Sequence, residues 1–146
     1  MLYEESIEID APTDVVWSVL ADVERWPSWT ASMASVELDA ATLEVGAKAR
    51  IRQPKLPTVV WEVTAVVPGR SFRWESASPG ISTVADHVVA PRAGGGSTVK
   101  LSLRQEGAAA FVARLLFSGI TRRYIRMEAH GLRRRSEELA ATLGQS

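Results

Sequence analysis

The stretch AAAFVARLLFSGITRRYIRMEAHGLRRRSEELAATL, residues 108–143, decides the fold of this chain. It contains no proline and is rich in good helix formers, so it predicts one long helix. At about 100° per residue, an inner stripe forms along one side of this helix. Its members are Leu116, Ile120, Tyr124, Met127 and Gly131. A helix of this length needs a broad surface beneath it, and a concave sheet would supply one.

Two features of the helix are each compatible with more than one way of packing. A second stripe, made of Leu132, Leu139 and Leu143, is rotated from the first, which indicates a bend or a curved partner. Gly119 and Gly131 each weaken a helix by up to ~1 kcal/mol relative to alanine. Gly119 would fit a kink, and Gly131 would allow either close packing or free volume beneath the helix. The basic residues off both stripes, as expected of a solvated face, are Arg122, Arg123, Arg126, His130, Arg133 and Arg134.

Seven segments before the helix alternate in polarity with a period of two, which is typical of strands. They are residues 3–9, 36–38, 48–53, 59–67, 72–76, 82–90 and 99–105. In the strongest of them, one face would carry Val59, Trp61, Val63, Ala65 and Val67. Short helical segments are expected at residues 15–20 and 23–26, between the first and second strands.

Short turns between successive strands favour antiparallel pairing, and the first strand can join the same sheet beside the last. The long helix is the one element able to cover the apolar face of that sheet. The expected fold is therefore α+β: a helix-grip fold, with a bent antiparallel sheet of six to seven strands around the long C-terminal helix. No repeat or linker divides the chain, so we expect residues 1–146 to form a single domain.

Composition argues against several classes of protein. Apolar residues make up 46% of the 146 residues, which is enough for a packed core. The 17 basic and 17 acidic residues cancel, so no net field favours nucleic acid or an anionic membrane. The absence of cysteine excludes disulfides and thiolate chemistry. No apolar run approaches the ~20 residues of a membrane span, and the acidic start does not resemble a secretory signal. We therefore expect a cytoplasmic protein without stable membrane insertion.

Several motifs carry a resemblance to a known family. They are Ile7-Glu8-Ile9-Asp10-Ala11-Pro12 with Val16-Trp17, Asp22-Val23-Glu24-Arg25-Trp26-Pro27-Ser28-Trp29, Gly46, Trp61-Glu62-Val63, Pro68-Gly69-Arg70, Phe72-Arg73-Trp74 and Glu137-Glu138-Leu139. In these residues the chain resembles the SRPBCC (START-like) superfamily of polyketide cyclases/dehydrases and lipid-transport proteins. The resemblance spans essentially the whole chain. It implies a deep, mostly apolar cavity between the sheet and the long helix, and it specifies little chemistry.

The phases of the strands and the helix place candidate residues around such a cavity. The expected ligand-binding residues are Trp29, Met33, Trp61, Phe72, Trp74, His87, Gln105, Tyr124 and Met127. His87 and Tyr124 are the catalytic candidates, because an imidazole or a phenol can exchange a proton or a hydrogen bond with a ligand oxygen. Each could instead have only a structural role: His87 as a hydrogen-bonded or rim-exposed histidine, and Tyr124 as a residue that packs in the core. Glu128 lies at the edge of the inner stripe and could either reach inward or pair with neighbours on the Arg126 side in solvent, of which the second is favoured.

The sequence predicts neither a metal site nor a cofactor. Its two histidines stand alone, and no nucleotide-binding motif is present. The favoured function is binding of a hydrophobic small molecule (lipid-, isoprenoid- or polyketide-like) in the cavity, with no nucleic-acid partner. The alternative is a polyketide cyclase/dehydratase-type enzyme using the same cavity. Binding is favoured because no pair of ionisable groups falls clearly on the inner face. A protein–protein adaptor that uses the sheet rim or the arginine face is a third, weaker hypothesis.

Overall fold

The structure, a computed structural model that describes residues 1–144, consists of one sheet, two α-helices and a 3₁₀ helix. In chain order the elements are β1 (Leu2–Ile9), α1 (Thr13–Ala21), η1 (Val23–Ser28), β2 (Ser35–Leu38), β3 (Lys48–Arg52), β4 (Val59–Val67), β5 (Ser71–Ser78), β6 (Ile81–Pro91), β7 (Ser97–Glu106) and α2 (Ala110–Gly144). The strands form a seven-stranded sheet in the order β1-β7-β6-β5-β4-β3-β2. Each pair is antiparallel.

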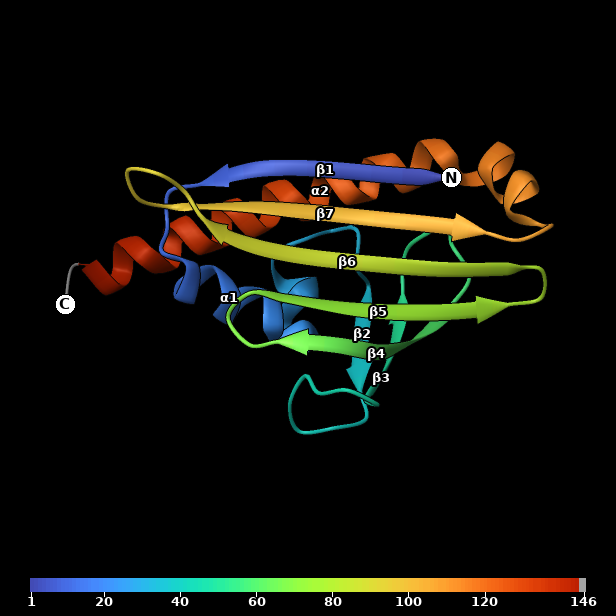
Figure 1. Cartoon of the computed structure of the whole chain (residues 1–146), viewed down its shortest axis with the longest axis horizontal. Coiled ribbons are helices and arrows are strands. Elements are labelled where there is room, and N and C mark those ends of the chain that lie inside the picture. Colours follow the sequence, from blue (N-terminus) through green and yellow to red (C-terminus); the bar gives the residue numbers. More distant parts are fainter. Residues whose placement is uncertain (145–146) are drawn as a thin grey trace.

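β1 joins the sheet beside β7, although the two strands lie at opposite ends of the strand series. Ile7 lies opposite Val99, and Tyr3 lies opposite Leu103. Figure 1 shows α2 running along the length of the sheet behind β1 and β7, while β2 and β3 cross the direction of β5 to β7. α2 contacts β1, β7 and α1. The predicted helix-grip fold, a bent antiparallel sheet with a long C-terminal helix, is confirmed.

β4 departs from the strict alternation that its sequence predicts. Val63 lies opposite Trp74, but Val66 lies opposite Phe72, because the register shifts between Val63 and Ala65. A bulge of this kind adds one residue to a strand and reverses the sides on which the following residues lie. Val66 therefore packs against the core, and Val67 is exposed. The prediction that Ala65 and Val67 lie on the same face as Val63 is therefore wrong.

The inner face of α2 also differs in part from the predicted stripe. Tyr124 and Gly131 are buried as predicted, but Leu116 is 69% exposed and Met127 is only partly buried. Besides Tyr124, the residues of α2 that line a cavity on the side of the sheet are Ala113, Phe117, Thr121, Ile125 and Glu128. Because Thr121 and Glu128 interrupt the apolar residues of this set, hydrophobic periodicity does not reveal it. The assignment of Leu116 to the inner stripe is therefore wrong.

Close packing explains Gly131, one of the two alternatives that the sequence leaves open. A Cβ at this position would collide with the main-chain carbonyl oxygen of Trp29. The same oxygen accepts a hydrogen bond from Nη2 of Arg134 at 2.9 Å. The Trp29 ring in turn packs on Trp26, with ring centroids 5.6 Å apart. The glycine therefore lets the backbone of α2 lie directly against the segment that follows η1.

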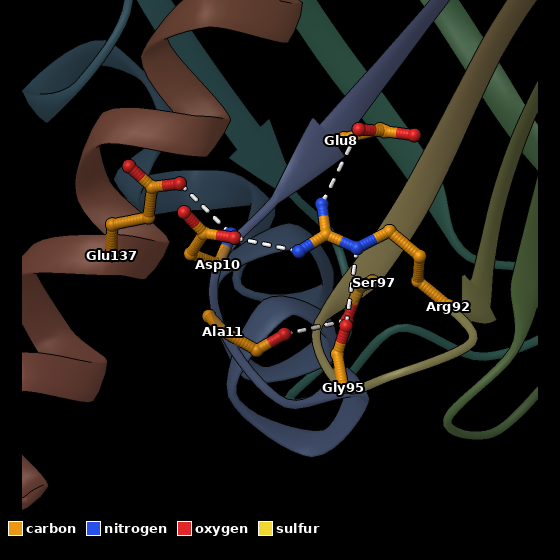
Figure 2. Close-up of polar contacts among 7 residues, drawn as sticks. All are labelled: Glu8, Asp10, Ala11, Arg92, Gly95, Ser97 and Glu137. Atoms are coloured by element: carbon orange, nitrogen blue, oxygen red, sulfur yellow. Dashed lines mark hydrogen bonds and ion pairs between the residues drawn. The ribbon is translucent and has the colours of Figure 1, made fainter.

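A second contact holds the same half of α2 (Figure 2). The main-chain N–H of Asp10 donates a hydrogen bond to Oε2 of Glu137 at 2.8 Å. Arg92 ties Asp10 to the β6–β7 loop, because its Nη2 lies 2.6 Å from Oδ1 of Asp10 and its Nε donates to the carbonyl of Gly95. Ser97 donates to the carbonyl of Ala11 at 2.7 Å. The end of β1, the β6–β7 hairpin and the last turns of α2 thus form one connected corner.

Substitutions at the two glycines within α2 should have opposite effects. Gly131→Ala should lower the free energy of unfolding by about 1–3 kcal/mol, the usual cost of overpacking. A Cβ at Gly119 meets nothing within 4 Å, and alanine favours a helix by up to ~1 kcal/mol. Gly119→Ala, the matched control, should therefore be as stable as the parent or more stable. Urea unfolding followed by circular dichroism measures both, and equal stabilities would contradict the close contact.

Candidate functional site

A cavity of about 240 Å³ lies between the sheet and the first half of α2, and it is partly open to solvent. Its walls are mostly apolar and include Met33, Ile51, Trp61, Trp74, Leu101 and Phe117. Polar side chains also reach it, among them Gln53, His87, Gln105, Tyr124 and Glu128. The cavity is thus an apolar space with a small number of polar groups, the usual composition of a small-molecule site.

Most of the ligand-binding residues expected from the sequence lie on this wall. They are Met33, Trp61, Trp74, His87, Gln105 and Tyr124. Trp29, Phe72 and Met127 lie outside it. Trp29 is buried against Gly131, and Phe72 is almost fully buried in the core beneath His87. Met127 is rotated about the helix axis by roughly a quarter turn from the inward-facing residues of α2, and its side chain is partly exposed. Contact with a ligand stays a prediction for the residues on the wall.

His87 is held rigidly on β6. Its ring stacks on that of Phe72, with centroids 4.0 Å apart and planes within 7°. Its Nδ1 lies 3.4 Å from the main-chain carbonyl of Phe72. Because a carbonyl only accepts, this contact places the proton on Nδ1 and leaves the lone pair of Nε2 toward α2. Burial lowers the pKa of His87 to about 4, so the imidazole is neutral at neutral pH.

Glu128 faces His87 from α2. Its Oε1 lies 3.8 Å from Nε2 of His87, and the residue is only 8% exposed. Burial raises the pKa of Glu128 to about 8, so the carboxyl carries its proton at neutral pH. The prediction that Glu128 pairs with arginines in solvent is wrong, because its position on the helix turns it toward the cavity. The available signal was its spacing of four residues from Tyr124, which places the two on one helix face.

Tyr124 has a different environment from the other polar groups. Its hydroxyl donates a hydrogen bond to the main-chain carbonyl of Pro54 at 2.5 Å. This bond joins α2 to the loop between β3 and β4, and residues of that loop, Gln53, Leu56 and Pro57, line the cavity. The phenolic proton is therefore already engaged, although the oxygen can still accept a hydrogen bond. Tyr124 closes the side of the cavity, whereas His87 and Glu128 present their exchangeable groups to each other.

The Glu128–His87 pair can act on a ligand as a donor and an acceptor. Their separation of 3.8 Å is longer than a hydrogen bond, so neither group is saturated by the other. A protonated carboxyl donates, and the Nε2 lone pair accepts. Within residues 1–144 no group of three or more histidine and acidic side chains is placed to hold a metal ion. The donor and the acceptor of the Glu128–His87 pair offer a ligand hydrogen bonds and proton transfer.

The two shifted pKa values affect stability with opposite signs. Between pH 4.5 and 8 the unfolded chain loses the Glu128 proton while the folded chain keeps it, so rising pH weakens folding. Between about pH 4 and 6.5 the unfolded chain binds a proton at His87 that the folded chain lacks, so rising pH strengthens folding. The effects oppose each other below pH 6.5. Above it, the Glu128 effect remains.

We therefore expect the free energy of unfolding to fall by about 1 kcal/mol from pH 6.5 to 8. Glu128→Gln keeps the shape of the side chain but has no proton to lose, so it should abolish most of the fall. Urea unfolding at a series of pH values measures the effect. Glu106→Gln, at an exposed position of β7, is the control and should retain the fall. The same fall in Glu128→Gln would contradict a protonated carboxyl.

Comparison with known proteins agrees with this architecture. The model of the family described as polyketide cyclase/dehydrase and lipid transport matches residues 2–137. The Zhui aromatase/cyclase from a Streptomyces species has a similar structure, with a TM-score of 0.76 at 16% identity over 94% of this chain and 93% of that chain. A protein from Thermus thermophilus gives a TM-score of 0.75 at 21% identity, covering 97% and 99% of the respective chains.

A third similar structure is the di-domain ARO/CYC protein StfQ from the steffimycin biosynthetic pathway. Its TM-score is 0.74 at 11% identity, and the match covers 99% of this chain but 52% of that chain. Likenesses at such low identity show the fold alone. No curated protein matches the chain significantly in sequence. Since the family model matches nearly the whole chain and the helix-grip fold agrees with it, the chain belongs to the polyketide cyclase/dehydrase and lipid transport family.

Proposed function

We propose that this protein binds a small, mostly apolar molecule in the cavity and holds a polar atom of that molecule against Glu128 and His87. The observation that carries the proposal is the cavity itself: its walls are mostly apolar, and on them Glu128 and His87 face each other. Such a space is the usual form of a ligand site. Membership of a family whose description includes lipid transport supports the same function.

The volume of the cavity limits the size of the ligand. A closed cavity of roughly 150 Å³ accepts benzene, so about 240 Å³ suits a molecule of about two rings, or a short branched chain. Part of a longer molecule can extend through the open side. The flat rings of Trp61 and Trp74, with centroids 6.1 Å apart, favour a flat ligand.

The polar pair limits the chemistry of the ligand. A protonated Glu128 donates a hydrogen bond, which a carbonyl or ether oxygen accepts. The Nε2 atom of His87 accepts one from a hydroxyl group. Apolar burial, at about 25 cal/mol per Å² removed from water, would then supply most of the affinity. The pair would orient the ligand.

Filling the cavity should abolish ligand uptake. Ala113 lies on the cavity wall, and Ala141 is exposed further along the same helix. Ala113→Phe should therefore reduce binding of the uncharged fluorescent probe N-phenylnaphthylamine by at least about tenfold, because the ring occupies the site. Ala141→Phe, the matched control, should bind like the parent. Fluorescence titration measures both affinities, and equal affinities would contradict binding in the cavity.

Proton transfer to the bound ligand is a second candidate function, favoured by the geometry of the Glu128–His87 pair. Glu128 can give its proton to a ligand carbonyl oxygen while Nε2 of His87 removes a proton from the adjacent carbon. The products are an enol, a carboxylate and an imidazolium, and the reverse step restores the starting groups. The expectation that no ionisable pair shares the inner face is wrong, since these residues do. The family description, which includes cyclases and dehydrases, is consistent with such chemistry.

Deuterium exchange distinguishes this function from binding alone. β-Tetralone is a flat apolar ketone, and exchange at the carbon beside its carbonyl in D₂O can be followed by NMR. If the pair transfers protons, the protein should accelerate the exchange, and Glu128→Gln should slow it by about 10²–10⁴-fold. His130→Gln, at an exposed position, is the control. Exchange no faster than in buffer would leave ligand binding as the function and exclude proton transfer on this ketone.

A further inference from the structure

The first turns of α2 expose four large apolar side chains that the cavity does not use. Phe111, Val112, Leu115 and Leu116 are 63%, 54%, 67% and 69% exposed. At about 100° per residue they fall within an arc of about 140° on the outer side of the helix. We call these four residues the apolar patch. A cluster of exposed apolar side chains usually marks a surface that contacts a partner or a membrane.

The outer side of α2 continues from this patch into a basic stripe, defined here as Arg122, Arg123 and Arg126. By the same angular count these arginines lie on the arc of the apolar patch, further along the helix. Among the described residues, no carboxylate lies within ion-pair distance of any of the three. Arg122 packs over the ring of Tyr3, and Arg122 and Arg126 line a shallow hollow that Glu4 and Glu5 of β1 also line. Glu128, the carboxylate within this part of α2, faces the cavity.

The same turns of α2 form the cavity wall on their other side. Val112 and Leu116 of the patch immediately precede Ala113 and Phe117, which line the cavity. Figure 1 shows these turns at the end of the sheet where β7 finishes and β1 begins. Whatever contacts the apolar patch therefore lies one helix thickness from the cavity.

We propose that the apolar patch and the basic stripe together dock the protein on an anionic lipid bilayer. Charge complementarity identifies this occupant: an interfacial helix combines apolar side chains that enter the bilayer boundary with arginines that contact lipid phosphates. The chain has no net charge, so the attraction is local to this face of α2. In the described part of the chain no helix is long and apolar enough to cross a membrane, so the docking is peripheral. The proposal holds whatever the cavity contains.

Vesicle flotation tests the two halves of the surface. The full chain should float with vesicles of phosphatidylcholine mixed with phosphatidylglycerol, should not float with phosphatidylcholine alone, and should be released by high salt. An arginine near an anionic surface contributes about fivefold in partitioning, so Arg122→Gln with Arg123→Gln should weaken binding by about thirtyfold. Leu115→Ser with Leu116→Ser should weaken it by at least about tenfold, since less apolar area enters the bilayer.

The matched controls use exposed residues of the sheet instead of residues of α2. Arg50→Gln with Arg52→Gln on β3 removes the same charge, and Val60→Ser with Val67→Ser on β4 removes exposed apolar side chains. Both double variants should float like the parent. Circular dichroism of every variant verifies that the fold is kept. Equal partitioning of the test and control variants would overturn the proposal.

Because the chain contains no cysteine, one introduced thiol can report insertion directly. An environment-sensitive nitrobenzoxadiazole label on Leu115→Cys should shift to shorter wavelength when phosphatidylglycerol vesicles are added. The same label on Val60→Cys should not shift. No shift at position 115 would overturn the proposal. A dimer in analytical ultracentrifugation that Leu115→Ser with Leu116→Ser abolishes would also overturn it, and would assign the patch to a second copy of the chain.

Discussion

The contact between Gly131 and the main-chain carbonyl of Trp29 sets the position of the long helix. With no side chain at this point, the backbone of α2 lies directly on the segment after η1, and Arg134 donates to the same carbonyl. The hydrogen bond from Asp10 to Glu137 holds the next turns. The second half of α2 is thus fixed at several points to the rest of the fold. Its first half, in contrast, extends over the sheet with small and polar residues inward.

This uneven packing creates the site. A fully packed helix would leave no empty space between itself and the sheet, because protein interiors are normally close-packed. Here the cavity lies under the part of α2 that precedes the anchor, and Glu128 stands one turn before Gly131. The anchor therefore keeps the carboxyl out of water and opposite His87, and the loss of hydration raises its pKa. Burying an acid and leaving a void both cost stability, and residues that do so are commonly kept for function.

The fold could be predicted largely from the sequence because it depends on repeated signals. Seven alternating segments and one long helix specify a helix-grip fold even where the predicted orientation of a single residue is wrong. The cavity wall could be predicted only in part, since a stripe that contains Ala113, Thr121 and Glu128 has no hydrophobic periodicity. The bulge in β4 left no clear mark in the sequence, and it moved Val66 inward. The burial of Glu128 depended on the exact rotation of α2, which the contact at Gly131 determines.

If the proposed function is correct, an apolar ligand occupies the space between Glu128, His87 and the tryptophans rather than the exposed apolar surface of α2. Intermolecular nuclear Overhauser effects between bound N-phenylnaphthylamine and the protein test this most directly. We expect contacts from the probe to the rings of Trp74 and Tyr124. Contacts to the side chains of Leu115 and Leu116, with none to Trp74 or Tyr124, would contradict it.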